Sequence, residues 1–333
     1  MSCIPTDNSL ANPSIYTTVL HTLTCILVPV NLFGAYCILF KTPKKMEAVK
    51  WLMLNLHLLS LILDLSVSFL SVPHVLLPVI GGYLFGVLNY PILNAYLIIS
   101  LLGGVGVGIS TIFENRYFVL YGKNTWWEKI RIPLLAFNYS LIPTFVLPSY
   151  PSTLFPEEAG LQQIQKLLPC SVPSSIDNQK LFILAVDYRI PFICSVGMTL
   201  WNSIQIFSFF MILLFKLVLL TPKMSVVSAK TNQMQRKFAF ALCIQTLLPF
   251  TVLFLPITWI CGSLILQYHD QLFNNISFSM FSVHGLLSTV TMISVHQPYR
   301  DFVLTPLYRL FDKKGGSSRN SITVSRVSIV VIQ

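Results

Sequence analysis

Long apolar stretches separated by short polar segments dominate the chain. Seven of these stretches contain almost no charged residue, and each approaches or exceeds the roughly 20 residues with which a helix crosses a lipid bilayer. The pattern therefore predicts seven membrane-spanning helices, at 16–40, 51–77, 91–113, 132–148, 190–215, 238–266 and 276–296.

The boundary between the second and third spans depends on turn signals. Residues 65–113 carry no formal charge, and this run is too long for one helix. Gly81-Gly82 and the Asn-Tyr-Pro sequence at 89–91 favour turns, so we expect them to separate the two spans. No internal repeat is apparent.

The predicted fold class is therefore all-α, a polytopic membrane protein with a seven-transmembrane helix bundle. The bundle is expected to occupy residues 1–311. Residues 312–333 begin with charged, Gly and Ser residues and predict a disordered tail.

Composition supports this picture. The chain is 54% hydrophobic and only 10% charged, whereas a soluble globular domain carries about 25% charged residues. A soluble enzyme, a disordered chain and a conventional nucleic-acid-binding protein are therefore excluded. The net charge of +10 is explained more simply by basic loops of a membrane protein than by a nucleic-acid partner.

The charges also predict an orientation. Four segments hold 19 of the 22 Lys and Arg residues but five of the 12 Asp and Glu residues, namely 41–50, 114–131, 216–237 and the tail from 300. The segments on the opposite side hold three basic and six acidic residues. Basic loops stay in the cytosol, so we expect the N-terminus outside and the C-terminus inside.

No catalytic or metal-binding pattern is visible. The six His residues are scattered, and no His-Glu-x-x-His or Cys-x-x-Cys spacing occurs. A glycine cluster at 103–108 lacks the Lys and Ser/Thr of a phosphate-binding loop; Gly104 and Gly108 suit close helix packing instead. We therefore predict no enzyme activity, no cofactor and no metal.

Asp64 is the one acidic residue deep in a predicted span. Ionisable side chains inside a membrane are costly and by default suggest a function. Asp64 could bind a cation or change protonation as helices move. Alternatively, it is a protonated side chain bonded within the bundle, to Asn31 or His57.

Several strings resemble a known receptor family. The first-loop sequence FGAYCILFKTPKKM at 33–46 is followed by LNLH at 54–57, FENRY at 113–117 and HQPYR at 296–300. This order is similar to that of class H of the nematode serpentine chemoreceptors. The resemblance implies a seven-helix, G-protein-coupled-receptor-like protein that binds a small environmental chemical. It also implies action through a heterotrimeric G protein, at the plasma membrane and in the sensory cilia of chemosensory neurons.

The resemblance assigns residues to G-protein coupling. Glu114, Arg116 and Tyr117 resemble the acidic-Arg-Tyr motif at the inner end of span three, although the acid lies one position further from the Arg than usual. The alternative is a basic anchor with an interfacial Tyr. The other coupling and switch residues are Asp64, Pro298, Tyr299, Arg236 and Lys237, although Pro298 could simply end span seven.

A ligand cavity is expected in the outer half, between spans three, five, six and seven. Tyr96, Trp201, Trp259 and His284 lie at a plausible depth, but each could equally serve bundle packing. By analogy with the outer disulfide of rhodopsin-like receptors, Cys170 is expected to pair with Cys3. Asn275 begins a glycosylation sequon close to the start of span seven.

Two alternatives stay open on the same scaffold: a neuropeptide receptor and a ligand-gated ion channel. The expected partners are a small-molecule ligand, a heterotrimeric G protein and the lipid bilayer, without nucleic acid. The sequence decides neither the ligand, nor the G-protein subtype, nor the oligomeric state.

Overall fold

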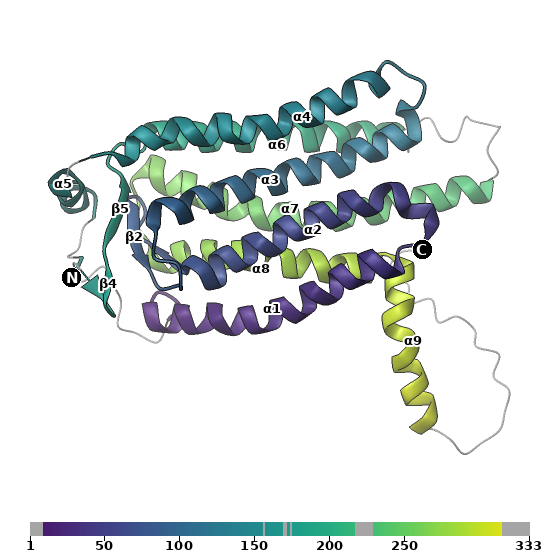
Figure 1. Ribbon diagram of the computed structural model, residues 1–333, viewed down its shortest axis with the longest axis horizontal. Helices are drawn as coiled ribbons and strands as arrows, with labels where there is room; N and C mark the ends of the chain where they lie inside the picture. The colour runs from purple at the N-terminus through teal and green to yellow at the C-terminus, as the bar shows by residue number, and fades with distance from the viewer. Residues whose placement is uncertain (1–8, 156, 169–171, 174, 217–228, 315–333) are drawn as a thin grey trace.

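The computed structural model describes residues 9–155, 157–168, 172–173, 175–216 and 229–314, which form an elongated bundle of long helices (Figure 1). The helices are α1 (Pro13–Lys41), α2 (Glu47–Leu65), α3 (Pro91–Tyr117), α4 (Trp127–Val146), α5 (Glu157–Leu167), α6 (Arg189–Phe215), α7 (Ala229–Leu266), α8 (Gln271–Val295) and α9 (Gln297–Lys314). Short helical turns adjoin them at Lys44–Met46, Ser66–Ser71, Phe118–Gly122 and Leu147–Thr153. Among the described residues, six helices are long and apolar enough to cross a membrane, and α7 adds the apolar stretch Phe250–Leu266.

The second span ends earlier than expected. Its helix stops at Ser71 instead of residue 77, because Val72 adopts a left-handed backbone conformation with φ of 42°. Pro73 follows and begins a β-strand. The predicted tail from 312 begins within α9, and residues 315–333 lie outside the described part.

A small β-sheet closes one end of the bundle. Its strands are β1 (Pro73–Val75), β2 (Ile80–Leu84) and β5 (Phe182–Ala185), paired antiparallel in that order, beside the two-stranded pair β3 (Ser175–Ile176) and β4 (Gln179–Lys180). The sheet and α5 lie at the end opposite α9 (Figure 1). A sheet at the end of the bundle was not expected from the sequence.

The prediction that Gly81-Gly82 forms a turn is wrong, because both glycines lie within β2. A Cβ at Gly81 would lie 2.6 Å from the Phe182 carbonyl oxygen, and one at Gly82 would collide with the carbonyl oxygen of His74. Glycine is required here because the neighbouring strands approach too closely for a side chain.

The side chain of His74, the middle residue of β1, is fully buried. The rings of Tyr16, Tyr83 and Phe85 surround its imidazole, with centroids 6.0–6.4 Å away. Tyr16 hydroxyl donates a hydrogen bond to the Pro73 carbonyl and so ties α1 to β1. The imidazole is therefore held in an apolar, aromatic environment that disfavours its charged form.

Acidification is expected to destabilise this end of the protein through His74. Burial, and to a smaller extent His269, lowers the pKa of the His74 imidazole to about 3, whereas an unfolded histidine titrates at about 6.5. Between these values the unfolded chain binds a proton that the folded chain does not. This contribution to stability is therefore complete above about pH 6.5 and falls by about 1.4 kcal/mol per pH unit below it.

Unfolding of the purified protein in detergent, followed between pH 7 and pH 5, checks this expectation. His74→Phe should lose about 2 kcal/mol of the pH dependence that the wild type shows over this range. His21→Phe, at a partly exposed histidine of α1, is the matched control and should keep it. Equal pH dependence in the wild type and His74→Phe would contradict the prediction.

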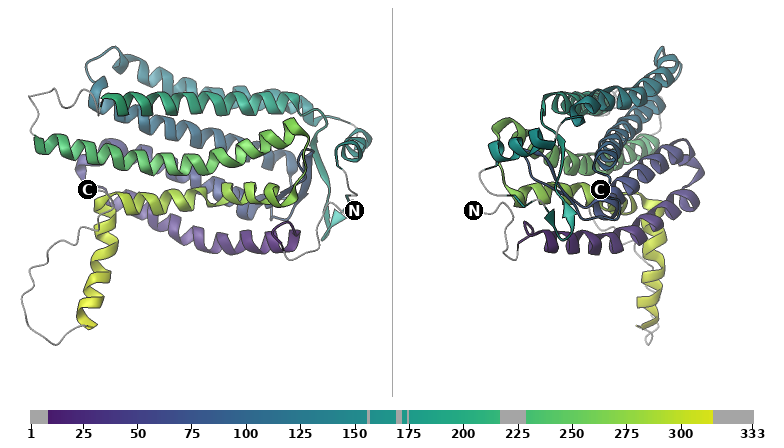
Figure 2. Two further views of the ribbon diagram at one scale, coloured as in Figure 1. Left: turned by 180° about the vertical axis from the view of Figure 1, so that it is seen from behind. Right: turned by 60° about the vertical axis from the view of Figure 1, so that its left-hand side comes forward.

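The third helix lies at the centre of the bundle and packs against α2, α4 and α6. Gly104 and Gly108 face α2, where an added Cβ would contact Leu59 and Leu56 at 3.5 Å and 3.1 Å. These glycines allow close helix packing, as small residues do in membrane helices. On the other side of the bundle, α7 lies between α6 and α8 (Figure 2).

The last described helix, α9, leaves the bundle and points across its long axis (Figures 1 and 2). Phe302 of α9 packs against Phe33 and Tyr36 of α1, and the Lys41 ammonium lies 4.3 Å from the Phe302 ring centre. The basic loops before α2 and α4 lie at this same end (Figure 1). We call it the basic end.

Candidate functional site

At the basic end, α3 is joined to α4 through Glu114. Trp127 Nε1 donates a hydrogen bond of 2.7 Å to Glu114 Oε1, and Arg131 Nη2 forms an ion pair of 3.3 Å with Glu114 Oε2. Arg131 Nη2 also donates to Asn115 Oδ1 at 3.0 Å, and its guanidinium stacks 3.8 Å from the Phe118 ring centre. The described bonds of Glu114 therefore run to Trp127 and Arg131 of α4, a pairing that the resembled motif does not predict.

Arg116 itself is 8% exposed, and its charge acts on His296. Burial, and to a smaller extent the Arg116 charge, lowers the pKa of His296 to about 4. His296 follows the last residue of α8. The basic end thus brings the Arg of α3 into electrostatic contact with the junction of α8 and α9.

Tyr117 belongs to the aromatic layer at the same end. Its ring contacts those of Trp127 and Phe209, at 5.7 Å and 6.2 Å, and the Lys216 ammonium lies 5.1 Å from it. This layer joins α3, α4 and α6, so a movement of one of these helices at the basic end would alter the contacts of Tyr117.

Pro298 and Tyr299 lie in the first turn of α9, where proline is well tolerated. Tyr299 is fully buried, and its hydroxyl lies 2.7 Å from the Thr42 hydroxyl, just after α1. The two residues therefore begin α9 and attach it to the end of α1.

Asp64 forms a fully buried polar contact between α2 and α8. Its Oδ1 accepts a hydrogen bond of 2.9 Å from the Gly285 backbone N–H, and its Oδ2 accepts one of 3.1 Å from Leu286. A Cβ on Gly285 would lie 2.5 Å from Oδ2, so the carboxyl group fits only against a glycine. The sequence-based alternative of a bundle contact names Asn31 or His57; Asn31 is a side-chain hydrogen-bond partner of Asp64, and the α8 backbone supplies two further bonds.

Asn31 and His57 form a neighbouring layer of the same contact. Thr289 of α8 donates to Asn31 Oδ1 at 2.5 Å, and a nitrogen of His57 lies 2.8 Å from the Asn31 carbonyl oxygen. Helices α1, α2 and α8 are thus joined by buried polar groups inside the bundle. Such bonds replace those that water would supply to the same groups outside a membrane.

The four predicted ligand residues are not brought together by any described contact. Tyr96 reaches Ser149 beyond α4, Trp201 donates to Asn138 of α4, and Trp259 donates to Asn274 of α8. His284 is buried in α8, and neither ring nitrogen has a hydrogen-bond partner in the described part of the chain. The hydrogen bonds of Tyr96, Trp201 and Trp259 each connect neighbouring parts of the bundle, as expected if these side chains serve packing. A ligand site shared by the four residues stays a prediction.

A polar cluster between α3, α4 and α6 was missed by sequence reasoning. The side-chain amides of Asn138 and Gln205 bond each other twice, at 2.8 Å, and Gln205 also accepts from Ser110. Trp201 completes the cluster. Polar residues inside three different spans are a weak signal of such a cluster, because the sequence does not show which helices are neighbours.

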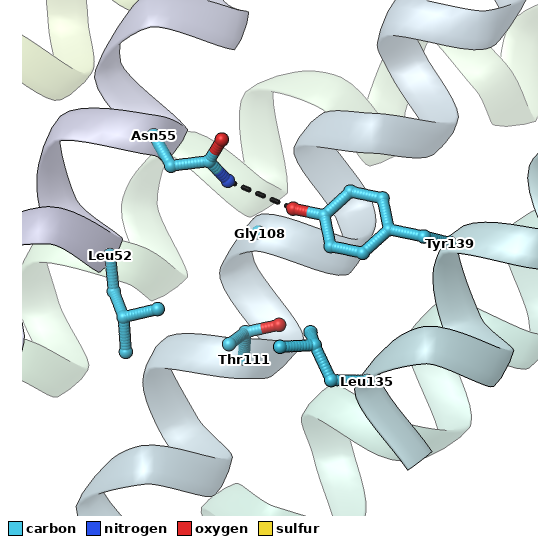
Figure 3. Close-up of a pocket in the computed structure, with 6 residues that line it drawn as sticks. All are labelled: Leu52, Asn55, Gly108, Thr111, Leu135 and Tyr139. Atoms are coloured by element: carbon cyan, nitrogen blue, oxygen red, sulfur yellow. Dashed lines mark hydrogen bonds between the residues drawn. The ribbon is translucent and has the colours of Figure 1, made fainter. Parts of the chain in front are cut away.

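A crevice between α2 and α4, with α3 as its floor, was also missed (Figure 3). It encloses about 300 Å³ and is lined by Leu52, Asn55, Gly108, Thr111, Leu135 and Tyr139. Asn55 donates a hydrogen bond of 2.8 Å to the Tyr139 hydroxyl across it. Toward the basic end it adjoins a cleft of about 500 Å³ that shares Leu52, Thr111 and Leu135.

Some predicted residues cannot be placed, or are placed unexpectedly. Cys3 and Cys170 lie outside the described residues, and so do the side chains of Arg236 and Lys237, which fall within the bounds of α7. Asn275 is fully buried, and its Nδ2 donates to the Leu10 carbonyl at 2.8 Å. This position does not favour glycosylation of the folded chain, and the modification stays a prediction.

In the part of the chain that the structure covers, no three His, Cys, Asp or Glu side chains cluster as a metal site would require.

Comparison with known proteins now identifies the family. The model of the family described as serpentine type 7TM GPCR chemoreceptor Srh matches residues 11–309. Serpentine receptor class H-72 of Caenorhabditis elegans is 26% identical over 293 residues, which cover 84% of this chain and 81% of that protein. The family match covers nearly the whole helix bundle, as the motif resemblance predicts. The chain therefore belongs to the Srh family of seven-transmembrane serpentine chemoreceptors, a family of receptors and not of enzymes.

Proposed function

We propose that this protein is a chemosensory receptor that binds a small environmental chemical or odorant and activates a heterotrimeric G protein. The observation that carries the proposal is the family match over residues 11–309. We place the protein in the plasma membrane as a multi-pass receptor, in the sensory cilia of chemosensory neurons.

We propose that the N-terminus is outside the cell and the basic end faces the cytosol. The excess of Lys and Arg in the loops at that end supports this orientation. The β-sheet, α5 and the start of α1 would then face outward (Figure 1). A ligand would bind in the outer half, where Tyr96, Trp201, Trp259 and His284 are the proposed contacts.

The proposed signal reaches the cytosol through two polar contacts between helices. Asp64 holds α2 against α8, and Glu114 holds α3 against α4. A ligand that prefers one of two helix arrangements shifts the population toward it. The G protein would then meet Arg116 and Tyr117, together with Pro298 and Tyr299 at the start of α9 and the basic pair Arg236 and Lys237.

A chemical panel on cells that express the full chain tests this function. Cytosolic calcium and membrane current are recorded together, with and without a promiscuous Gα subunit. We expect at least one chemical to raise calcium only when Gα is present. Arg116→Ala should abolish the response, whereas Arg189→Ala, at an exposed Arg near the sheet, should keep it. Surface expression of each variant is measured alongside.

Three outcomes would contradict parts of the proposal. A current that persists without Gα would indicate a ligand-gated channel. A calcium response that survives in Arg116→Ala at equal surface expression would remove Arg116 from the coupling surface. A response to peptides, and not to volatile or soluble small chemicals, would instead favour a neuropeptide receptor.

A further inference from the structure

The crevice between α2 and α4 is a built site with no assigned occupant. Both helices pack on α3, and Gly108 supplies a floor without a side chain. The polar bridge from Asn55 to Tyr139 crosses the crevice on the side away from the basic end (Figure 3). From Arg131 to Tyr139 the crevice extends about 12 Å along α4, since an α-helix rises about 1.5 Å per residue.

The walls change character along this length. Around the bridge, Leu52 and Leu135 provide apolar walls. Toward the basic end the larger cleft is lined by Trp51, Ile132 and Phe209, and then by the charged side chains of Lys123, Glu114 and Arg131. Trp51 is 64% exposed at this mouth, and Ile132 is also exposed. The site is therefore exposed at its mouth, where the walls are charged. Farther from the mouth, apolar walls alternate with the polar groups of Asn55, Tyr139, Asn138 and Gln205.

The charge at the mouth is positive. Glu114 already forms its ion pair with Arg131, so its negative charge is balanced within the protein. Lys123 is exposed and adds a second cation beside Arg131. The bonds described for Arg131 use only Nη2, whereas a guanidinium carries five N–H donors. An anionic group at the mouth would therefore meet the Lys123 ammonium and the N–H donors of Arg131 that form none of these bonds.

We propose that this crevice binds an anionic phospholipid, with its phosphate at Lys123 and Arg131 and the first part of one acyl chain over Gly108. Basic pockets between transmembrane helices at the cytosolic side commonly hold anionic headgroups. A phospholipid suits the site because it combines an anionic head with an apolar chain, in the same order as the walls. The exposed ring of Trp51 at the mouth suits a position near the headgroups.

A phospholipid bound in the crevice would affect the contacts between α3 and α4 at the basic end. Glu114 and Asn115 line the same cleft and bond Arg131, and Arg116 is the next residue along the chain. A phosphate on Arg131 would share the guanidinium that fastens α3 to α4. The bound lipid would therefore act on the Glu114 contact without touching an outer ligand cavity.

Photocrosslinking of the full chain in nanodiscs tests the proposal. The discs consist of phosphatidylcholine with a minor fraction of either phosphatidylglycerol or phosphatidylcholine that carries a diazirine in its acyl chain. Mass spectrometry measures labelling of residues 51–55 and 131–139, normalised to labelling of the exposed face of α1 in the same sample. We expect the phosphatidylglycerol probe to label the crevice about five-fold more than the phosphatidylcholine probe, the order expected for one added basic contact.

Lys123→Gln and Lys129→Gln provide a matched pair. Both lysines are exposed and close in sequence, but only Lys123 lines the cleft. Lys123→Gln should lower the preference for phosphatidylglycerol to nearly one-fold, whereas Lys129→Gln should leave it unchanged. The proposal is overturned by equal normalised labelling with the two probes in the wild type. It is also overturned if Lys129→Gln reduces the preference as much as Lys123→Gln, since a diffuse surface charge would then suffice.

Discussion

Asp64→Ala is expected to lower the free energy of unfolding by about 3 kcal/mol, the largest effect we expect from an intramembrane side chain. The substitution removes two hydrogen bonds to the backbone of α8, at Gly285 and Leu286, and leaves a void where the carboxyl group was. Each buried hydrogen bond contributes about 1 kcal/mol, and the void adds a further cost. Unfolding of the purified protein in detergent measures the difference.

Asp187→Ala is the matched control for this change. Asp187 lies before α6, where its side chain is 61% exposed and 3.9 Å from Arg189. An exposed ion pair of this kind contributes little, and the side chain also accepts a hydrogen bond of 2.9 Å from the Arg189 backbone N–H at the start of α6, so we expect a loss of at most about 1 kcal/mol. If Asp64→Ala were as mild as Asp187→Ala, the contact between α2 and α8 would not hold the bundle together.

Gly285→Ala is expected to cost a similar amount, about 3 kcal/mol, for a steric reason. Its Cβ would lie 2.5 Å from Asp64 Oδ2 and 3.0 Å from the carboxyl carbon, so α2 and α8 must separate to admit it. Overpacking of a tight interior typically costs 1–3 kcal/mol. The same unfolding measurement detects this cost.

Gly262→Ala is expected to change the free energy of unfolding in the opposite direction, and it controls for helix propensity. No atom lies within 4 Å of a Cβ at Gly262 in α7. Alanine favours a helix over glycine, so this change should stabilise the protein by up to about 1 kcal/mol.

The double variant Asp64→Ala/Gly285→Ala should be destabilised by less than the sum of the two single-variant losses. The first change removes the atoms that the second would meet. Strict additivity would show that the two residues do not act on one contact.

The sequence does not show that Asp64 and Gly285 are in contact. Asp64 is identifiable as unusual because a lone acid stands in an apolar run. Its partners are backbone N–H groups of α8, about 220 positions away, and every residue except proline carries such a group. Gly285 resembles any other small residue of a membrane helix. Only the packing of α2 on α8 selects this glycine.

For Glu114, too, the sequence predicts the position along the chain but not the contacts of the side chain. Sequence reasoning places it at the inner end of span three and expects an acid-Arg-Tyr motif. In the structure its carboxyl group contacts Trp127 and Arg131, on the next helix. The chain reverses direction between α3 and α4, and the geometry of that turn decides which side chains meet the carboxyl group. The ligand residues and the crevice depend in the same way on which helices are neighbours.

The sequence by itself determined that this chain is a helical membrane protein of the Srh family. Membrane helices can be recognised from the sequence because a helix that spans the bilayer must be long, apolar and nearly free of charge. Each of these properties is local in the sequence. The tertiary structure decided the β-sheet over Gly81 and Gly82, the bonds of Asp64 to α8 and the crevice beside Tyr139. These features depend on which faces of distant helices and strands come together, and no local pattern of residues encodes that choice.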